Sequence, residues 1–222
     1  MPFLLVEILN FQGSAHLRGV GSLSKLFTED TKYVNYSHPA IQKKAQELFE
    51  DGMTEVEKAQ KAYYFVRDEI KHSFDIGAKV VSITASDALL NGTGVCHVKS
   101  NLLAALLRSQ GIPAGFCFQY LTLDDKDASR GYVTHGYNAV YLEAHWVKLD
   151  ARGNKENVHA EFSLGEPILA FPIREELNEY DVAGIFAKPN MTSIRYLESL
   201  QELDPYKYAD CNRVEQKPDI LL

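Results

Sequence analysis

GTGVCHVKSNLLAALLRSQGIP, residues 92–113, predicts the central element of the fold. Apolar side chains recur at helical spacing between residues 98 and 107, and the sequence Gly-Ile-Pro then stops the pattern. Two glycines and a cysteine, Cys96, precede these apolar residues. The segment therefore predicts a well-buried helix that has Cys96 at its amino end and runs roughly to Gln110.

The position of Cys96 favours the reactive form of a thiol. Unpaired backbone N–H groups at a helix start favour negative charge, and they lower the pKa of a cysteine placed there. The glycines before Cys96 let the backbone turn sharply at little steric cost. A buried structural cysteine is the alternative that this stretch leaves open.

Helical patterns precede this segment and alternating patterns follow it. We expect helices over 37–52, 54–74 and 84–91, then strands over 114–123 and within 132–154, with a turn near 142–144. A further helical pattern lies near 192–203. Helices followed by antiparallel strands indicate an α+β fold. We expect one domain over 1–222, with a core at about 38–152 and a C-terminal extension over 153–222.

Composition bounds the partners of the protein. The 222 residues include 30 acidic and 23 basic ones, for a net charge of −7, and no basic stripe is present. This argues against nucleic acid as a partner. Three cysteines with no CxxC pattern give no disulfide framework and no zinc motif. The sequence therefore predicts neither a metal nor a cofactor.

The first twelve residues are apolar, but they are too short to span a bilayer. They also lack the basic region and the small-residue cleavage site of a secretory signal. We expect a first strand or short helix there, in a cytoplasmic protein with no membrane partner. The sequence leaves the oligomeric state open.

A cysteine nucleophile usually needs an imidazole base, and the imidazole needs an orienting group. Among the seven histidines, His135 lies on a predicted strand, and Asp150 closes the next strand. If paired residue numbers in this hairpin add to an odd value such as 285, His135 and Asp150 share a face of the sheet. An even value would place them on opposite faces.

Two segments of the chain resemble the transglutaminase-like superfamily: GVCHVKSNLLAALLRSQGIPAGF, residues 94–116, and THGYNAVYLEAHWVKLD, residues 134–150. The shared features are a Gly-x-Cys helix with a Gly-Ile-Pro tail, a histidine on one strand, and a tryptophan four residues before an aspartate on the next. The similarity covers about Lys58 to Asp150, and the whole chain resembles small bacterial proteins of this superfamily.

This resemblance implies a papain-like fold, in which a helix that carries the cysteine packs on an antiparallel sheet that carries the other two residues. It also implies a catalytic triad: Cys96 is the nucleophile, His135 is the base and Asp150 orients the imidazole.

The sequence departs from the superfamily pattern at three places. The usual His-Ala-Trp is His135-Gly136-Tyr137, the usual aromatic residue after the cysteine is His97, and a common tyrosine is His72. His72, His97 and Tyr137 are therefore candidates for oxyanion or substrate contacts. A surface position at a helix end is the alternative for His72, and packing or a pocket wall is the alternative for His97.

The resemblance favours an enzyme that attacks an amide of a peptide or protein and forms a thioester on Cys96. We expect a peptidase or amidase rather than an amine-accepting acyltransferase. The first alternative is a non-catalytic module that binds peptides or proteins on the same scaffold. The second is a metal site at Cys96, His97 and His135, although this spacing matches no zinc pattern.

Overall fold

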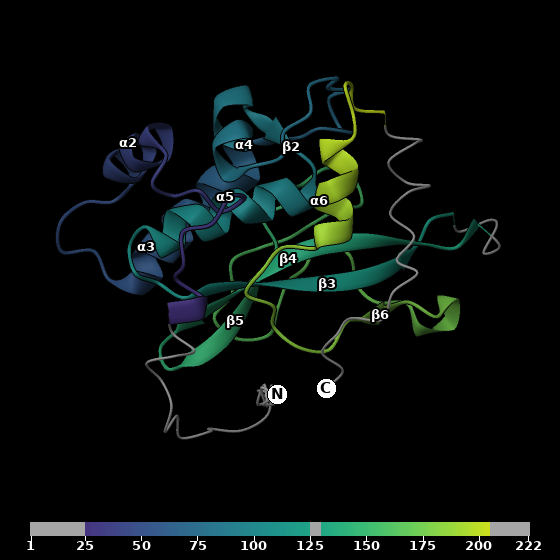
Figure 1. Cartoon of the computed structure of the whole chain (residues 1–222). Helices are drawn as coiled ribbons and strands as arrows, with labels where there is room; N and C mark the ends of the chain where they lie inside the picture. Colours follow the sequence, from purple (N-terminus) through teal and green to yellow (C-terminus); the bar gives the residue numbers. More distant parts are fainter. Residues whose placement is uncertain (1–24, 125–129, 205–222) are drawn as a thin grey trace, which may run out of the picture.

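The computed structural model describes residues 25–124 and 130–204, and it packs a group of helices on an antiparallel sheet (Figure 1). The helices are α2 (Pro39–Leu48), α3 (Glu55–Tyr64), α4 (Ala85–Asn91), α5 (Cys96–Arg108) and α6 (Met191–Glu198). The strands are β1 (Lys71–His72), β2 (Thr93–Gly94), β3 (Ala114–Thr122), β4 (Tyr132–Leu142), β5 (His145–Leu149) and β6 (Tyr180–Asp181). The α+β prediction is therefore confirmed. The apolar opening segment and Cys211 lie outside the described residues.

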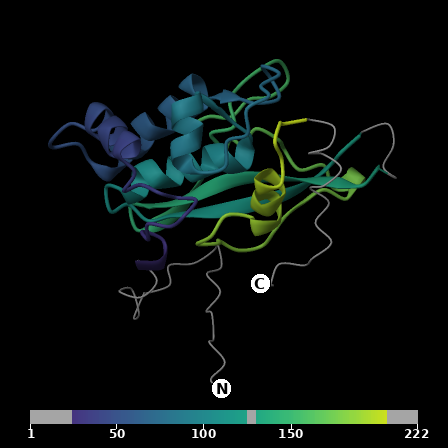
Figure 2. The same cartoon turned by 45° about the horizontal axis from the view of Figure 1, so that its top comes forward.

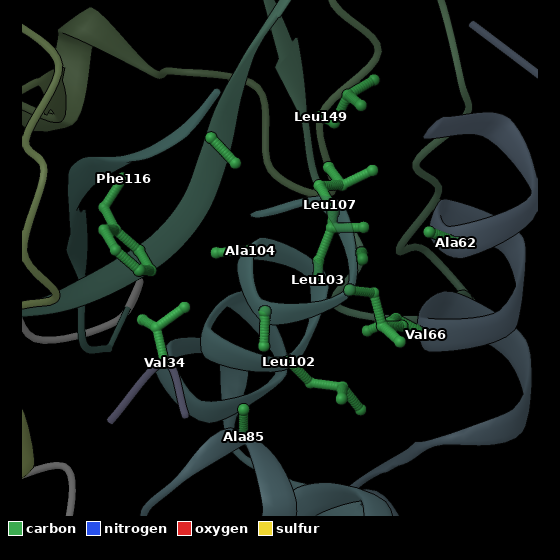
Figure 3. Close-up of a cluster of buried hydrophobic side chains, with 14 of the residues drawn as sticks. Val34, Ala62, Val66, Ala85, Leu102, Leu103, Ala104, Leu107, Phe116 and Leu149 are labelled. Atoms are coloured by element: carbon green, nitrogen blue, oxygen red, sulfur yellow. The ribbon is translucent and has the colours of Figure 1, made fainter. Parts of the chain in front are cut away.

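Helix α5 lies at the centre of the molecule, and all of its residues are buried. Its leucines pack against α3, α4 and the sheet to form the main core (Figure 3). Two cations on this helix are also buried, and each is satisfied by carbonyls. Lys99 donates to the carbonyls of Arg67 and Ile70, while Arg108 donates to those of Glu29, Ala114 and Ala187. Burial around the whole helix fixes Cys96 at a defined place above the sheet.

The helix predicted over 54–74 is shorter than expected. It begins with a capping box formed by Thr54 and Glu57, but α3 ends at Tyr64 and a π-helical turn follows over Phe65–Glu69. The carbonyls at the end of this turn would need N–H donors from a further helical turn. The side chain of Lys99, on α5, donates to them instead, so the helix can end here.

The chain after this turn forms a short parallel pair that the sequence did not predict. Strand β1 pairs with β2, with Lys71 opposite Thr93 and His72 opposite Gly94. Strands of two residues leave no alternating pattern for prediction. The pairing places His72 beside the residues that lead into Cys96.

The larger sheet has the strand order β5-β4-β3-β6 and is antiparallel throughout. Strands β3 and β4 pair from Ala114 opposite Val140 to Thr122 opposite Tyr132. The β4–β5 turn at Glu143 and Ala144 has positive φ at both residues, as in a type I′ hairpin. This confirms the turn predicted near 142–144.

The two faces of the sheet are covered by different parts of the chain. Helices α2 to α5 lie together on one side (Figures 1 and 2). On the other face, Cys117, Tyr137 and Ala139 form a second core with Leu169 and Ile185. The segment that follows Asp150 therefore completes the packing of the sheet. Within the described ranges, no helix is long and apolar enough to cross a membrane.

Candidate active site

Cys96 is the first residue of α5, and its side chain lines a pocket of about 570 Å³. The residue before it, Val95, is extended and caps the helix without a side-chain hydrogen bond. Val95 therefore provides no side-chain oxygen that competes for the N–H groups of the first turn. The predicted position at a helix start is confirmed, and the pocket gives the thiol an opening although Cys96 is only 8% exposed.

His135 lies between Cys96 and Asp150. Its Nε2 atom is 2.8 Å from Oδ2 of Asp150, and it lies close enough to the Cys96 thiol to lower the pKa of that group. Because Nε2 faces the carboxylate, Nδ1 is the ring nitrogen left for Cys96. The Gly136 backbone also lowers the pKa of the thiol. The structure thus brings together the three residues that the sequence singled out.

The hairpin register explains how His135 reaches Asp150. Paired residue numbers add to 287, as for Asn138 opposite Leu149. The sum is odd, as the hypothesis requires. It differs by two from the value of 285 that would place His135 directly opposite Asp150. His135 and Asp150 therefore share a face but are offset along it rather than directly opposed. Strand β5 ends at Leu149, and Asp150 bonds to His135 from the coil that follows.

Asp150 is completely buried, and every partner of its carboxylate is a donor. Besides His135, the backbone N–H of Arg152 donates to Oδ1 at 3.1 Å and that of Ala170 donates to Oδ2 at 2.9 Å. Burial raises the pKa of Asp150, but the charge and hydrogen bond of His135 and the two backbone donors outweigh it, and the net shift is downward. The carboxylate is therefore ionised beside the imidazole.

The electrostatics favour an ion pair between Cys96 and His135. Burial lowers the pKa of His135, but the charge and hydrogen bond of Asp150, with the contribution of Cys96, raise it to about 10. Burial raises the pKa of the Cys96 thiol, whereas His135 and the Gly136 backbone lower it, and the net shift is below the usual 9.0. Both pKa shifts therefore favour the thiolate–imidazolium form of the pair.

His72 also lines the pocket and is 7% exposed, so it is not a surface residue. Its Nδ1 is buried without a hydrogen-bond partner among the described residues. Burial, reinforced by the charge of Arg152, holds the pKa of His72 well below 6.5. His72 is therefore a neutral imidazole beside the nucleophile, with one N–H to donate.

His97 and Tyr137 do not line this pocket. The His97 ring packs between α5 and β4, with Nε2 at 3.1 Å from the carbonyl of Thr134. Tyr137 is buried beneath His135, its ring stacked at 6.3 Å, and its hydroxyl donates to Asp181 at 3.0 Å. His97 thus contacts the strand next to His135, and Tyr137 contacts the His135 ring. Neither residue lines the pocket.

Most of the pocket wall beyond Cys96 and His135 is apolar. The apolar lining residues come from several parts of the chain: Phe74, Val95, Leu121, Leu123, Val133, Ala170, Phe171 and Pro172. Two arginines at the wall are paired with carboxylates, Arg152 with Asp75 and Arg174 with Glu179. Arg152 is therefore the partner of an acidic residue and not a free cation at the wall.

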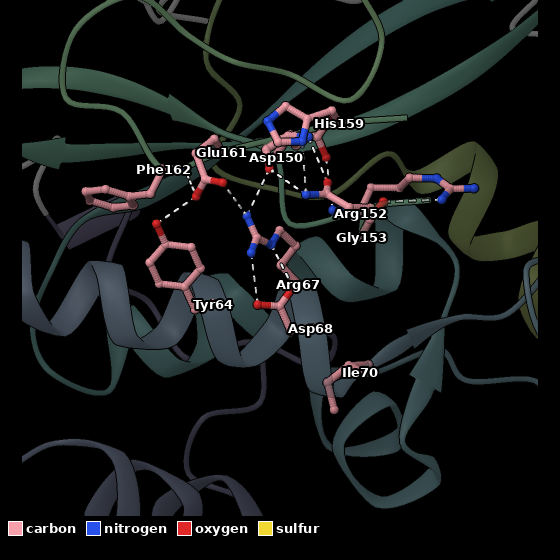
Figure 4. A network of polar contacts seen from close by, with 12 residues as sticks. Tyr64, Arg67, Asp68, Ile70, Asp150, Arg152, Gly153, His159, Glu161 and Phe162 are labelled. Carbon is pink, nitrogen blue, oxygen red and sulfur yellow. Dashed lines mark hydrogen bonds and ion pairs between the residues drawn. The ribbon is translucent and has the colours of Figure 1, made fainter. Parts of the chain in front are cut away.

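Residues 160–174 contribute to the site, and the sequence analysis missed them. The Phe171 ring meets His135 edge-on at 5.0 Å, and Ala170 donates to Asp150 through its backbone. A backbone N–H is common to every residue except proline, so no motif marks this position. Figure 4 shows how the segment is held: Arg67 bridges Asp68 and Glu161.

Across residues 25–124 and 130–204, no group of three or more His, Cys, Asp or Glu residues is arranged to hold a metal ion. Cys117, the other described cysteine, is buried in the second core. Burial raises the pKa of its thiol to about 12, so Cys117 serves in packing.

A cysteine at a helix start, an imidazole and a buried carboxylate define a candidate cysteine-nucleophile site on this α+β fold. The sequence model of the transglutaminase-like superfamily matches residues 42–151, which include Cys96, His135 and Asp150. Through these residues the chain belongs to the transglutaminase-like superfamily, and the resemblance found in the sequence is confirmed.

Solved structures show more distant similarity. A "putative cysteine protease" from Cytophaga hutchinsonii aligns with 62% of this chain over 43% of its own length, at 20% identity and a TM-score of 0.48. A "putative protease" from Parabacteroides distasonis aligns with 64% of this chain over 28% of its own length, at 17% identity and a TM-score of 0.40. The chain thus spans less than half the length of either protein. No curated protein matches the chain.

Proposed function

We propose that the protein is a cysteine peptidase or amidase that cleaves an amide of a peptide or protein through a thioester on Cys96. The observation that carries this proposal is that Cys96 and His135 line one pocket and that Oδ2 of Asp150 lies 2.8 Å from Nε2 of His135. Cys96 is the nucleophile, His135 is the general acid and base, and Asp150 orients the imidazole and supports its positive charge.

The reaction has two stages. The Cys96 thiolate attacks the amide carbonyl, and a carbon–sulfur bond forms. The tetrahedral intermediate then expels the amine as the carbon–nitrogen bond breaks, and His135 gives the amine its proton. Water next attacks the thioester while His135 accepts a proton from it. The carbon–sulfur bond breaks, and the acid leaves with the thiolate and imidazolium restored.

The negative oxygen of the tetrahedral intermediate needs donors. The backbone N–H of Cys96 at the start of α5 is one candidate, since α5 provides no earlier carbonyl for it. His72 is the second candidate, because it is neutral, lines the same pocket and lacks a partner at Nδ1. We assign it this donor role in place of the tyrosine that is common in the superfamily.

The pocket supports a substrate with an apolar group next to the scissile amide. Phe171, Leu121 and Val133 would bury such a group, whereas a charged group would lose its water among these apolar side chains. Arg152 and Arg174 are each paired with a carboxylate, so they provide little attraction for an acidic substrate. This chemistry favours a peptidase or amidase over an enzyme that selects glutamine side chains.

Peptide p-nitroanilides test this proposal. We expect apolar residues before the anilide to release p-nitroaniline and to leave an acyl adduct on Cys96 by mass spectrometry. Residues with a carboxamide or a charge should react at least about tenfold more slowly, as the loss of one well-buried apolar group implies. Cys96→Ala should form no adduct, and Cys117→Ser should behave as the wild type because Cys117 lies in the second core.

The products separate the candidate functions. A free acid, even with methylamine present, supports a hydrolase, whereas an N-methylamide as the main product would show an amine-accepting acyltransferase. Tight peptide binding with no adduct on Cys96 would overturn the enzymatic proposal in favour of a binding module.

A further inference from the structure

Side chains of α5 bond directly to the backbone of β4 on either side of His135. His97 bonds to the Thr134 carbonyl at 3.1 Å, and Ser100 donates to the Gly136 carbonyl at 3.2 Å. The Gly136 backbone also lies near the Cys96 thiol, whose pKa it lowers. The two elements that carry the nucleophile and the base therefore meet over three consecutive residues of the strand.

The His97 ring is fixed in this contact and is 2% exposed. Since a carbonyl only accepts, Nε2 of His97 carries the proton and donates to Thr134. Ser193 of α6 places its Oγ atom 3.1 Å from the same nitrogen. Burial, with the charge of His135, lowers the pKa of His97 to about 3, so the ring stays neutral at the pH values of interest.

The ring occupies the space in which residue 136 would carry a side chain. A Cβ atom built on Gly136 would lie 2.5 Å from Nδ1 and 3.0 Å from Cε1 of His97. The φ angle of Gly136 is not among the positive ones, so its backbone conformation is open to any L-residue. The close approach of His97 is therefore the reason for the glycine.

We propose that His97 is a positioning residue that sets the alignment of Cys96 with His135, and that Gly136 is the space its ring requires. This inference rests on the proposed function. Through Ser193, the same contact ties α6 to the catalytic strand. The proposal also connects two departures from the superfamily pattern. His97 stands where an aromatic residue is usual, and Gly136, which stands where alanine is usual, leaves room for the His97 ring.

A double-mutant cycle on the full chain tests the pair, with iodoacetamide alkylation of Cys96 at pH 6 as the readout. Gly136→Ala forces the ring aside, and the rate should fall about a hundredfold. His97→Ala loses the bond to Thr134, and the rate should fall about tenfold. The double variant should react about as fast as His97→Ala alone, because the clash is gone. Coupling of this size is typical of residues in contact.

Gly115→Ala is the matched control, since Gly115 lies on the neighbouring strand β3. A Cβ there would meet Ile185 Cγ2 at 2.6 Å, away from the catalytic pair. Gly115→Ala should lower the thermal unfolding midpoint without shifting the pH at which Cys96 becomes reactive, and His97→Ala should not rescue it. Gly136→Ala should instead shift that pH upward.

Each outcome decides between the two proposals. If wild-type Cys96 alkylates at pH 6 no faster than a free thiol, the proposed function fails. If wild-type Cys96 is reactive but the two substitutions act additively, or if Gly136→Ala matches the wild type, the positioning role fails. If Gly136→Ala does not fold, the double variant still decides: the pair is supported if it folds and reacts, and rejected if it also fails to fold.

Discussion

At the scale of single residues, two opposing effects set the pKa of the Cys96 thiol. Burial disfavours the thiolate, while the imidazolium of His135 and the Gly136 backbone favour it. Asp150 acts one step further away, because it keeps His135 charged. The helix start alone is therefore not the decisive influence on this thiol.

This balance predicts the pH dependence of alkylation. In the wild type, the rate of Cys96 alkylation by iodoacetamide should rise with an inflection below pH 9. In His135→Ala the main opposing partner is gone and burial remains, so the inflection should move above pH 9. His145→Ala, which changes an exposed histidine on β5, should match the wild type. An unchanged inflection in His135→Ala would contradict the ion pair.

At the scale of elements, the site depends on a segment outside the residues that match the superfamily. Ala170 and Phe171 follow β5 by about twenty residues, and they contact Asp150 and His135. Gln119 on β3, opposite His135 in the register, donates to the Phe171 carbonyl at 3.3 Å. The superfamily core thus carries the reactive side chains, and this later segment holds two of them in place.

Ala170→Pro tests this contribution, because proline removes the N–H that donates to Asp150. With one donor fewer, the pKa of Asp150 should rise and its support for the His135 charge should weaken. We expect Cys96 alkylation at pH 6 to slow about tenfold, as loss of a hydrogen bond to a charged group implies. Ala170→Gly keeps the N–H and is the control. Equal rates in the two variants, both with native circular dichroism, would refute the role.

At the scale of the whole molecule, an ion pair joins the two sides of the pocket. Asp75, which follows β1, bonds to both terminal nitrogens of Arg152, at 2.5 and 2.9 Å, and to Lys155 at 2.7 Å. Burial raises the pKa of Asp75, but the hydrogen bonds of Arg152 and Lys155 lower it to about 2. The ion pair thus connects the segment after β1 with the segment that follows Asp150.

This pair predicts how stability changes in acid. The folded-state pKa of about 2 lies below the usual 3.8, so the ionised group contributes stability that is present above pH 3.8. That contribution is lost as the pH falls from 3.8 through about 2. Asp75→Asn should therefore lower the urea midpoint at pH 7 and lose less stability than the wild type on acidification. Parallel curves for the two proteins would exclude the contribution.

The sequence by itself determined the central helix and the hairpin, and it singled out Cys96, His135 and Asp150 as candidate catalytic residues. Each of these features left a local signal in the sequence. Apolar spacing marked α5, alternation marked the strands, and side chains with few chemical alternatives marked the candidate residues. Only the parity of the hairpin register had to be assumed, and the side chains that share a face follow from it.

Only the tertiary structure decided the surroundings of these residues. The contact of His97 with Gly136, the Ala170 donor and the parallel pairing that seats His72 join residues far apart in the chain, through backbone groups or close approach. Such contacts have no period and no characteristic residue type, so sequence patterns do not reveal them. They form only when the helices and the later segment pack on the two faces of the sheet.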